Sequence, residues 1–202
     1  MNKKALIGIL AAVGVLLVLF LVFSKASYVS NSTSTPVATT TGEITSATAE
    51  VENKRWPVRL DIPKLEVEAP MQYMGINAKG NMEDPNNFTD VGWYKLGTIP
   101  GNTGSAVMAG HQDNGYGLNG VFKYLHTLKI GDDVYVVNGE GKKLHYRVVE
   151  TAVYPWNAGP LERIFNAKDG KYLNLITCSG VWSKVAGSND KRLVVYTELV
   201  EN

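Results

Sequence analysis

The sequence predicts an all-β domain with short helices, attached to a membrane by one apolar segment. Three observations support this fold class: an uncharged apolar run near the N-terminus, a Ser/Thr-rich stretch after it, and six short apolar segments separated by turn residues. Short strands with turn residues between them are typical of a closed antiparallel-type barrel or of a sandwich. Periodicity alone does not choose between these two folds.

Composition narrows the classes of function. The chain has 202 residues, a length that suits one domain with appendages. Its 20 basic and 19 acidic residues nearly balance, which argues against nucleic acid as a partner because phosphate binding needs a basic excess. The single cysteine excludes an intramolecular disulfide and a cysteine-rich metal site.

Residues 5–23 form an apolar run without charge or proline, preceded by two lysines. As a helix the run spans about 29 Å, close to the hydrocarbon thickness of a bilayer. It predicts a single-pass transmembrane signal anchor in the cell membrane, with residues 1–4 as a cytoplasmic tip and the rest of the chain outside. Small residues at 24–26 leave a cleaved signal peptide as an alternative, although the run exceeds the usual signal core. A buried core helix of this length would carry a polar face.

Residues 24–54 differ from the anchor in composition. They contain 13 Ser or Thr among 31 residues and one aromatic, Tyr28. Such a segment cannot bury enough apolar surface to offset its ordering entropy, so we expect a flexible stalk. Residues 55–202 have a globular composition and no net charge, and 148 residues suit one core. They predict one extracellular domain.

The elements of this domain follow from its apolar patterns. Strands are predicted at 58–62, 104–110, 133–137, 144–149, 172–178 and 192–197. The turn residues 138–141 predict a hairpin between the third and fourth of these strands. Short helices are predicted at 121–128 and at 160–165, where Pro160 stands near the first helical position.

Cys178 ends the fifth predicted strand and is followed by Ser179 and Gly180. A lone cysteine in an extracellular domain is either a buried apolar side chain or a nucleophile. As a nucleophile it needs an acid or base partner, because a free thiol is only slightly ionised at neutral pH.

The candidate partners of the thiol are a histidine and an arginine. His145 lies within a predicted strand and His126 in a short helical stretch, where both suit structural or surface roles. His111 stands where an apolar strand opens into a loop, a usual place for catalytic groups. Arg192 opens the last predicted strand. Beside Cys178 on a neighbouring strand, its guanidinium could hold a substrate carbonyl or a developing oxyanion.

Six short motifs occur in a fixed order along the outer domain. They are Ile62-Pro63-Lys64-Leu65-Glu66-Val67, Val91-Gly92-Trp93-Tyr94, Pro100-Gly101, Ala109-Gly110-His111, Leu175-Ile176-Thr177-Cys178 and Arg192-Leu193-Val194-Val195-Tyr196. With the N-terminal anchor and the order His, Cys, Arg, they resemble the sortases, membrane-anchored cysteine transpeptidases of bacterial cell envelopes. The family pattern before the nucleophile is T-L-x-T-C, and Asn174 replaces its first Thr here. The VGWY segment and the compact, lid-free sequence look most like class F.

The resemblance implies a closed eight-stranded sortase-type β-barrel and a catalytic triad of Cys178, His111 and Arg192. Cys178 would attack the Thr carbonyl of an LPxTG-like sorting signal, cleave the Thr–Gly bond and form a thioacyl enzyme. His111 would protonate the leaving amine and later deprotonate an incoming amine. Arg192 would bind substrate backbone and stabilise the tetrahedral intermediate. Family analogy also places Ala109 and Ile176 near the peptide groove.

The partners expected from the resemblance are secreted proteins with a C-terminal sorting signal, a cell-wall precursor amine such as a peptidoglycan stem or cross-bridge, and the membrane through the N-terminal helix. No cofactor or metal is expected, because no histidine pair or carboxylate cluster has ligand spacing. Pilus-polymerising sortases usually carry an Asp-Pro-aromatic lid. Asp84-Pro85-Asn86 lacks the aromatic, so pilin polymerisation is the alternative to general protein anchoring.

Two other functions compete with this one. The domain could be a membrane-tethered binding module in which Cys178 is structural. It could also be another cysteine peptidase or an L,D-transpeptidase. The latter usually has His close to Cys in an S-H-G-C type segment, whereas 67 residues separate His111 from Cys178 here. Papain-like enzymes place Cys before His, the opposite order.

Overall fold

The computed structural model describes residues 53–113 and 117–201. The predicted cytoplasmic tip at 1–4, the anchor at 5–23 and the predicted stalk at 24–54, apart from its last two residues, lie outside the described residues. Within the described part, no helix has the length and apolar character that a bilayer crossing needs.

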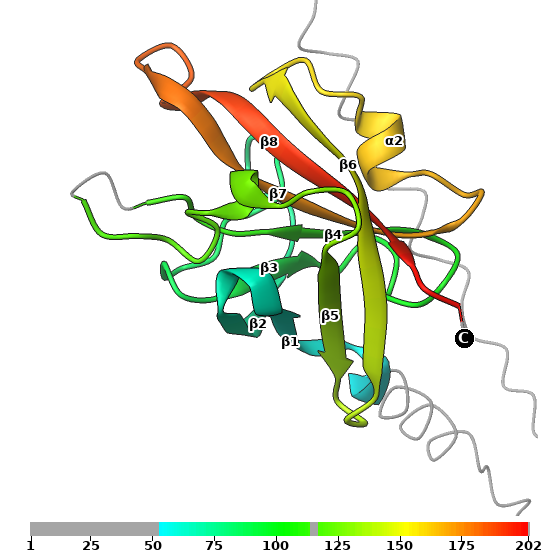
Figure 1. The fold of residues 1–202 in the computed structure, drawn as a ribbon. Helices are drawn as coiled ribbons and strands as arrows, with labels where there is room; N and C mark the ends of the chain where they lie inside the picture. Colours follow the sequence, from blue (N-terminus) through cyan, green and yellow to red (C-terminus); the bar gives the residue numbers. More distant parts are fainter. Residues whose placement is uncertain (1–52, 114–116, 202) are drawn as a thin grey trace, which may run out of the picture. The chain divides into compact units, whose positions relative to one another are not determined.

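Eight strands of the described chain close into one barrel (Figure 1). They are β1 (Pro57–Ile62), β2 (Val67–Met74), β3 (Val91–Tyr94), β4 (Gly104–Ala109), β5 (Asp133–Asn138), β6 (Lys143–Pro155), β7 (Lys171–Ser183) and β8 (Ser188–Leu199). Their order around the barrel is β1-β2-β3-β4-β7-β8-β6-β5. The helical pieces are short: α2 (Leu161–Phe165) and two 3-10 turns, η1 (Pro63–Leu65) and η2 (Leu125–Thr127). The eight-stranded barrel is therefore confirmed and the sandwich is excluded.

The observed strands extend and correct the predicted ones. The six predicted segments correspond to β1, β4, β5, β6, β7 and β8, of which the last three are longer than predicted. The apolar pattern does not predict β2, which contains Pro70, or β3, which has only four residues. The predicted helix at 121–128 is wrong, because only the 3-10 turn η2 forms there. The predicted helix at 160–165 forms as α2, with Pro160 as its N-cap.

The prediction of antiparallel-type pairing is wrong at two places. β2 pairs with β3 in parallel, and β4 pairs with β7 in parallel. Parallel neighbours need a crossover connection, which the segment 75–90 supplies for the first pair. For the second pair the crossover contains β5, β6 and α2.

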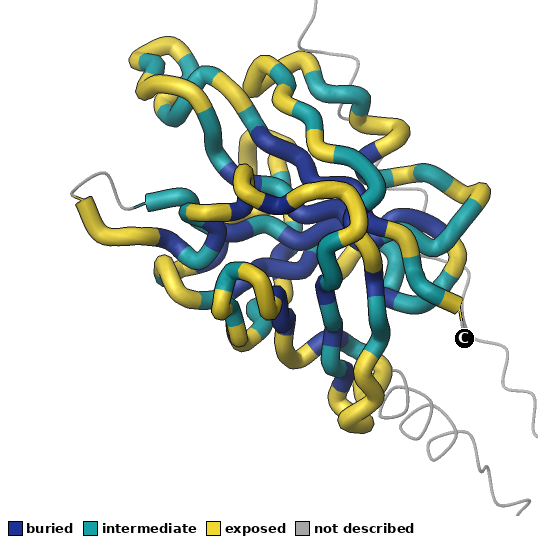
Figure 2. Tube along the Cα trace, in the orientation of Figure 1, coloured by how far each residue is buried: buried dark blue, intermediate teal, exposed yellow. Residues whose placement is uncertain are grey.

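β4 and the middle parts of β7 and β8 form a wall that is buried on both faces (Figure 2). The barrel interior is filled by large apolar side chains, with Trp93, Phe122 and Tyr146 fully buried. A second cluster covers the outer face of the wall, formed by Val107, Ile164, Val194 and Tyr196. Strands buried on both faces have nearly continuous apolar sequences, which accounts for the apolar run of β4.

A buried tyrosine ties the loop after β3 to the barrel. The backbone N–H of Gly101 donates a hydrogen bond of 2.7 Å to the hydroxyl of Tyr146. Gly101 has a φ of 92°, which L side chains rarely adopt. Burial raises the pKa of Tyr146, so its hydroxyl stays neutral.

Replacing Tyr146 by Phe is expected to lower the free energy of unfolding by about 1–3 kcal/mol, because the partly buried N–H of Gly101 loses its acceptor. Chemical denaturation monitored by fluorescence measures this change. Tyr124→Phe is the matched control, because Tyr124 is 53% exposed, and should change stability by less than about 0.5 kcal/mol. Equal effects of the two substitutions would contradict the prediction.

Candidate active site

The strand register brings the three predicted catalytic residues to one level of the barrel wall. β7 and β8 pair antiparallel, with Cys178 opposite Arg192. β4 and β7 pair in parallel, with Ala109 opposite Ile176. Continuing that register by two residues sets His111 level with Cys178, and the hydrogen bond of 3.1 Å from the Gly110 N–H to the Ile176 carbonyl carries the pairing beyond the end of β4.

Cys178 and Arg192 share one face of the wall. Side chains alternate along a strand, so Cys178 lies on the face of Ile176, and Arg192 lies on the face of Val194. Ile176 and Val194 line a groove on the outside of the barrel. Arg192 itself lines the groove, and Cys178 lies on the same face of the wall.

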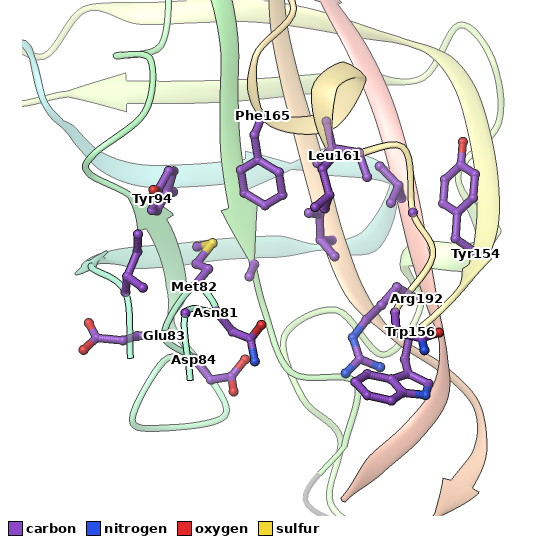
Figure 3. A pocket seen from close by; sticks show the side chains of 18 of the residues that line it. Asn81, Met82, Glu83, Asp84, Tyr94, Tyr154, Trp156, Leu161, Phe165 and Arg192 are labelled. Atoms are coloured by element: carbon purple, nitrogen blue, oxygen red, sulfur yellow. The ribbon is translucent and has the colours of Figure 1, made fainter. Parts of the chain in front are cut away.

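The groove has a volume of about 700 Å³ and runs between the loop 76–84, the end of β6 and α2. Ala109 and Ile176, the predicted substrate-binding residues, both line it. Its apolar lining consists mainly of Met82, Tyr94, Leu161, Ile164, Phe165 and Val194. Figure 3 shows Arg192 together with Trp156 at one end of the groove, and Leu161 and Phe165 at the other.

Cys178 is a free, half-buried cysteine. Together with Gln112 and Lys123 it borders a second hollow of about 250 Å³, which shares no lining residue with the groove. Burial raises the pKa of the Cys178 thiol above its ordinary value, while the charge of Arg192 lowers it and the carboxylates of Asp84 and Asp113 raise it. The net shift is upward, so the thiol form predominates at neutral pH.

The first residues of β8 hold the guanidinium of Arg192. Nη1 of Arg192 donates to the carbonyl oxygens of Asn189 and Lys191, both at 2.8 Å, and Nη2 donates to Ser188 Oγ at 2.9 Å. The backbone N–H of Trp156 donates to the Asp190 carbonyl at 3.0 Å and joins the end of β6 to the same part of β8. A guanidinium has five N–H donors, so two remain for a substrate oxygen.

The segment that carries His111 is fixed on several sides. Thr177 Oγ1 donates to the Gly110 carbonyl at 2.8 Å, and the Phe122 N–H donates to the His111 carbonyl at 2.9 Å. A Cβ at position 120 would clash with that carbonyl, so only glycine fits at Gly120.

The imidazole of His111 contacts two residues, Pro85 and Phe88, that the sequence did not indicate as part of the site. Nε2 lies 2.9 Å from the carbonyl oxygen of Pro85, and the ring of Phe88 lies 4.8 Å from the imidazole, centroid to centroid. A carbonyl oxygen only accepts, so Nε2 carries the hydrogen. Both residues stand more than 20 positions before His111, and no local pattern could have indicated these contacts.

The remaining histidines lie elsewhere. His145 Nε2 lies 2.7 Å from Asp133 Oδ1, and its ring stacks on Tyr135. His126 is exposed in η2. Across residues 53–113 and 117–201, no three side chains of His, Cys, Asp or Glu come together as metal ligands.

A closed β-barrel with a cysteine, a histidine and an arginine at one level of its wall suits a cysteine-dependent acyl-transfer enzyme. The model of the Sortase domain family matches residues 60–200, and the chain belongs to the sortase family. Sortases are cysteine transpeptidases, so the predicted enzyme class is confirmed and the binding module is excluded. Assignment to class F stays a prediction. No curated protein sequence matches the chain.

Solved sortase structures share the fold. Sortase C-1 from Actinomyces oris is 25% identical, with a TM-score of 0.58, over 80% of this chain and 81% of that one. Sortase C1 from Streptococcus agalactiae, in complex with MTSET, is 22% identical with a TM-score of 0.55, over 71% and 67% of the two chains. Sortase A from Listeria monocytogenes is 22% identical with a TM-score of 0.54, over 72% and 88%.

The environment of Cys178 predicts its reactivity. Its alkylation by iodoacetamide should rise with pH through a midpoint above that of a free cysteine, because burial and two carboxylates disfavour the thiolate. Asp84→Asn removes one of these negative charges. It should lower the midpoint and speed alkylation about two- to threefold at neutral pH.

The control for this measurement is Asp169→Asn, just before the opposite end of β7. It should leave the alkylation profile unchanged, since charges more than a Debye length apart are largely screened. Identical profiles for Asp84→Asn and the wild-type protein would contradict this account of the thiol.

Proposed function

We propose that this sortase is a membrane-anchored transpeptidase that cleaves an LPxTG-like sorting signal between Thr and Gly and transfers the acyl group to a cell-wall amine. One observation carries the proposal: Cys178 on β7 is paired with Arg192 on β8 beside an apolar groove, and the register of β4 with β7, continued by two residues, brings His111 to the same level. The family supplies the reaction class, and the groove supplies a place for an extended peptide.

In the first half of the reaction, the Cys178 thiolate attacks the Thr carbonyl carbon. The C–N bond to Gly breaks, and the leaving nitrogen takes a proton from the imidazolium of His111. A neutral amine leaves and a thioacyl enzyme remains. Dividing one difficult acyl transfer between two easier steps is the usual advantage of a nucleophilic side chain.

In the second half, an incoming amine attacks the thioester and gives its proton to His111. The C–S bond breaks, the Cys178 thiolate returns and the new amide leaves. Arg192 directs its two remaining N–H donors at the oxyanion of each tetrahedral intermediate. The first residues of β8 hold the guanidinium in advance, so little reorganisation is needed during reaction.

The groove suits the peptide part of the substrate. Ala109 and Ile176 provide a floor for an extended chain, and the apolar side chains of α2 provide a wall for the Leu-Pro portion. Apolar lining with a few polar groups at one end is the usual character of a ligand site. The partners would be secreted proteins with C-terminal sorting signals and a peptidoglycan stem or cross-bridge amine. The segment 5–23 would hold the enzyme in the cell membrane.

Pilus polymerisation is the second candidate function. The fold matches several sortase C structures, one of which is described as pilus-related. The two functions differ in the acceptor, because a pilin polymerase joins the acyl group to a lysine of another subunit. Competition between a peptidoglycan-stem peptide and a lysine-containing pilin peptide for the thioacyl enzyme decides between them.

Cys178→Ala in the full-length chain, purified in detergent, should reduce cleavage of a fluorogenic LPxTG peptide by more than about 1000-fold, because the thioacyl intermediate cannot form. Its thermal midpoint should stay close to that of the wild-type protein. Ser179→Ala, the next residue on β7, is the matched control and should retain cleavage. A variant that keeps cleaving the peptide would refute the proposed nucleophile.

Amine acceptors should accelerate turnover of the same peptide, because they compete with water for the thioacyl enzyme. Hydroxylamine or triglycine, added at millimolar concentration, should give an acyl-amine product that mass spectrometry detects. Arg192→Gln should slow formation of the acyl enzyme by about 100-fold or more, since an oxyanion donor is lost. Turnover with water as the sole acceptor would overturn the transpeptidase function.

A further inference from the structure

A loop between β2 and β3 covers one side of the imidazole of His111. We call residues 85–90 the strap. It touches the histidine twice, through the Pro85 carbonyl at 2.9 Å from Nε2 and through the Phe88 ring at 4.8 Å. The Phe88 carbonyl also accepts a 2.7 Å hydrogen bond from the N–H of Val121. The strap therefore contacts both the ring of His111 and the backbone of Val121, ten positions later in the sequence.

Gln72 of β2 fastens the strap to the barrel. Its Nε2 donates to Asn86 Oδ1 at 2.8 Å and to Asp90 Oδ2 at 2.9 Å. Its Oε1 accepts from the N–H of Asn86 at 3.1 Å. One side chain thus binds both ends of the strap and sets its distance from β2.

Hydrogen bonds within the strap fix its shape. Asn87 Oδ1 accepts from the N–H groups of Thr89, at 3.0 Å, and Asp90, at 2.8 Å. Asn87 Nδ2 donates to Asp90 Oδ2 at 2.8 Å. Hydrogen bonds from Gln72, Asn87 and Thr89 hold the pKa of Asp90 below its usual value, so its carboxylate remains a charged acceptor. Asparagine and aspartate bonds of this kind replace regular structure in a turn.

We propose that the strap is a positioning element for the reaction, and that it keeps His111 in one orientation with Nε2 protonated, so that Nδ1 is the nitrogen that exchanges protons with the leaving and incoming amines. Gln72 and Phe88 are its positioning residues. This inference rests on the proposed function, because it assigns the proton path of the same site.

The proposed proton path begins with a His111 imidazole that carries a hydrogen on both nitrogens. Nε2–H donates to the Pro85 carbonyl throughout the reaction. As the C–N bond breaks, the leaving nitrogen keeps the electron pair of that bond and accepts the proton from Nδ1. The imidazole becomes neutral, with a lone pair on Nδ1. The incoming amine then loses a proton to that lone pair as it forms the new C–N bond. Among the described residues, no hydrogen-bond partner meets Nδ1, so it is available for both transfers.

Fixing the hydrogen of His111 on Nε2 leaves Nδ1 free for proton transfer at every turnover. A neutral imidazole in water interconverts between two tautomers, and a ring rotation would exchange the positions of its nitrogens. A carbonyl acceptor on one nitrogen selects the tautomer, and the tilted ring of Phe88 beside the imidazole restricts its rotation. The bond partner of one ring nitrogen thereby determines the chemistry of the other.

The test compares two acyl donors in the full-length enzyme, a sorting peptide and the corresponding peptide thioester. An amine must be protonated to leave, whereas a thiolate leaves without a proton. In Phe88→Leu and Gln72→Leu, acyl-enzyme formation from the peptide should fall about tenfold, and that from the thioester should change less than twofold. The double variant should fall about as far as either single variant, because both act through the strap.

The matched control is Tyr135→Leu, which removes another aromatic contact to an imidazole, that of His145 at 4.7 Å, away from the site. It should leave both donors unaffected. Phe88→Tyr keeps the ring and should restore the rate with the peptide. Phe88 is 41% exposed, so its replacement by leucine is compatible with folding even if Gln72→Leu is not.

Nitrogen NMR of the imidazoles provides the direct readout. In the wild-type protein the His111 Nε2 should give the signal of a protonated nitrogen, and in the strap variants both tautomers should appear. Equal loss with both donors, no loss with either, or an unchanged tautomer in the variants would overturn the inference. If the wild-type enzyme forms no acyl enzyme from either donor, the proposed function fails instead, while the NMR comparison still tests the strap.

Discussion

The parallel pairing of β4 with β7 is the constraint on which the rest of the site depends. It holds residues 67 positions apart in the sequence at one level, from Gly104 opposite Lys171 to Ala109 opposite Ile176. The antiparallel partner β8 then adds Arg192 opposite Cys178. A shift of one residue in either pairing would turn one of the three side chains to the opposite face, because alternation along a strand has a period of two. The geometry of the site is thus a property of the register.

Burial on both faces gives the wall its single register. Inside the barrel, Leu173 and Leu175 are completely buried, and on the outside Val107 and Val194 are covered by α2. A slipped register would place Asn174 or Thr177 in the wrong layer, where their hydrogen bonds to the Ile164 and Gly110 carbonyls would be lost. Polar side chains in the wall therefore fix the strands as firmly as the apolar ones do, since an unsatisfied buried group is costly.

Features that depend on local sequence pattern, such as hairpins, were predicted correctly. Features that depend on which strands pair, such as the parallel crossovers, were not predicted. The alternation in β5 and the turn at 138–141 identified a hairpin that the structure confirms, with Gly141 at a φ of 78°. Cys178 and Arg192 were expected at strand ends, whereas they lie within β7 and β8, which are longer than predicted. The choice of Cys178, His111 and Arg192 as candidates depended mainly on the family motifs. The parallel crossovers could not be predicted, because the apolar run of β4 is equally compatible with parallel and antiparallel neighbours.

The contacts of the His111 imidazole could not be predicted either, because they also join residues far apart in the sequence. Pro85 takes part through its backbone carbonyl, a group that every residue has, and Phe88 is a half-exposed aromatic in a loop without periodicity. Burial, Asp84 and Asp113 raise the pKa of Cys178, so the thiolate is a minor form of this side chain at neutral pH. In the proposed reaction, each attack by the thiolate then depends on a histidine already in the right orientation. The raised pKa of the thiol makes the positioning of its partner more important to the rate, and the loop between β2 and β3 is where the fold supplies that positioning.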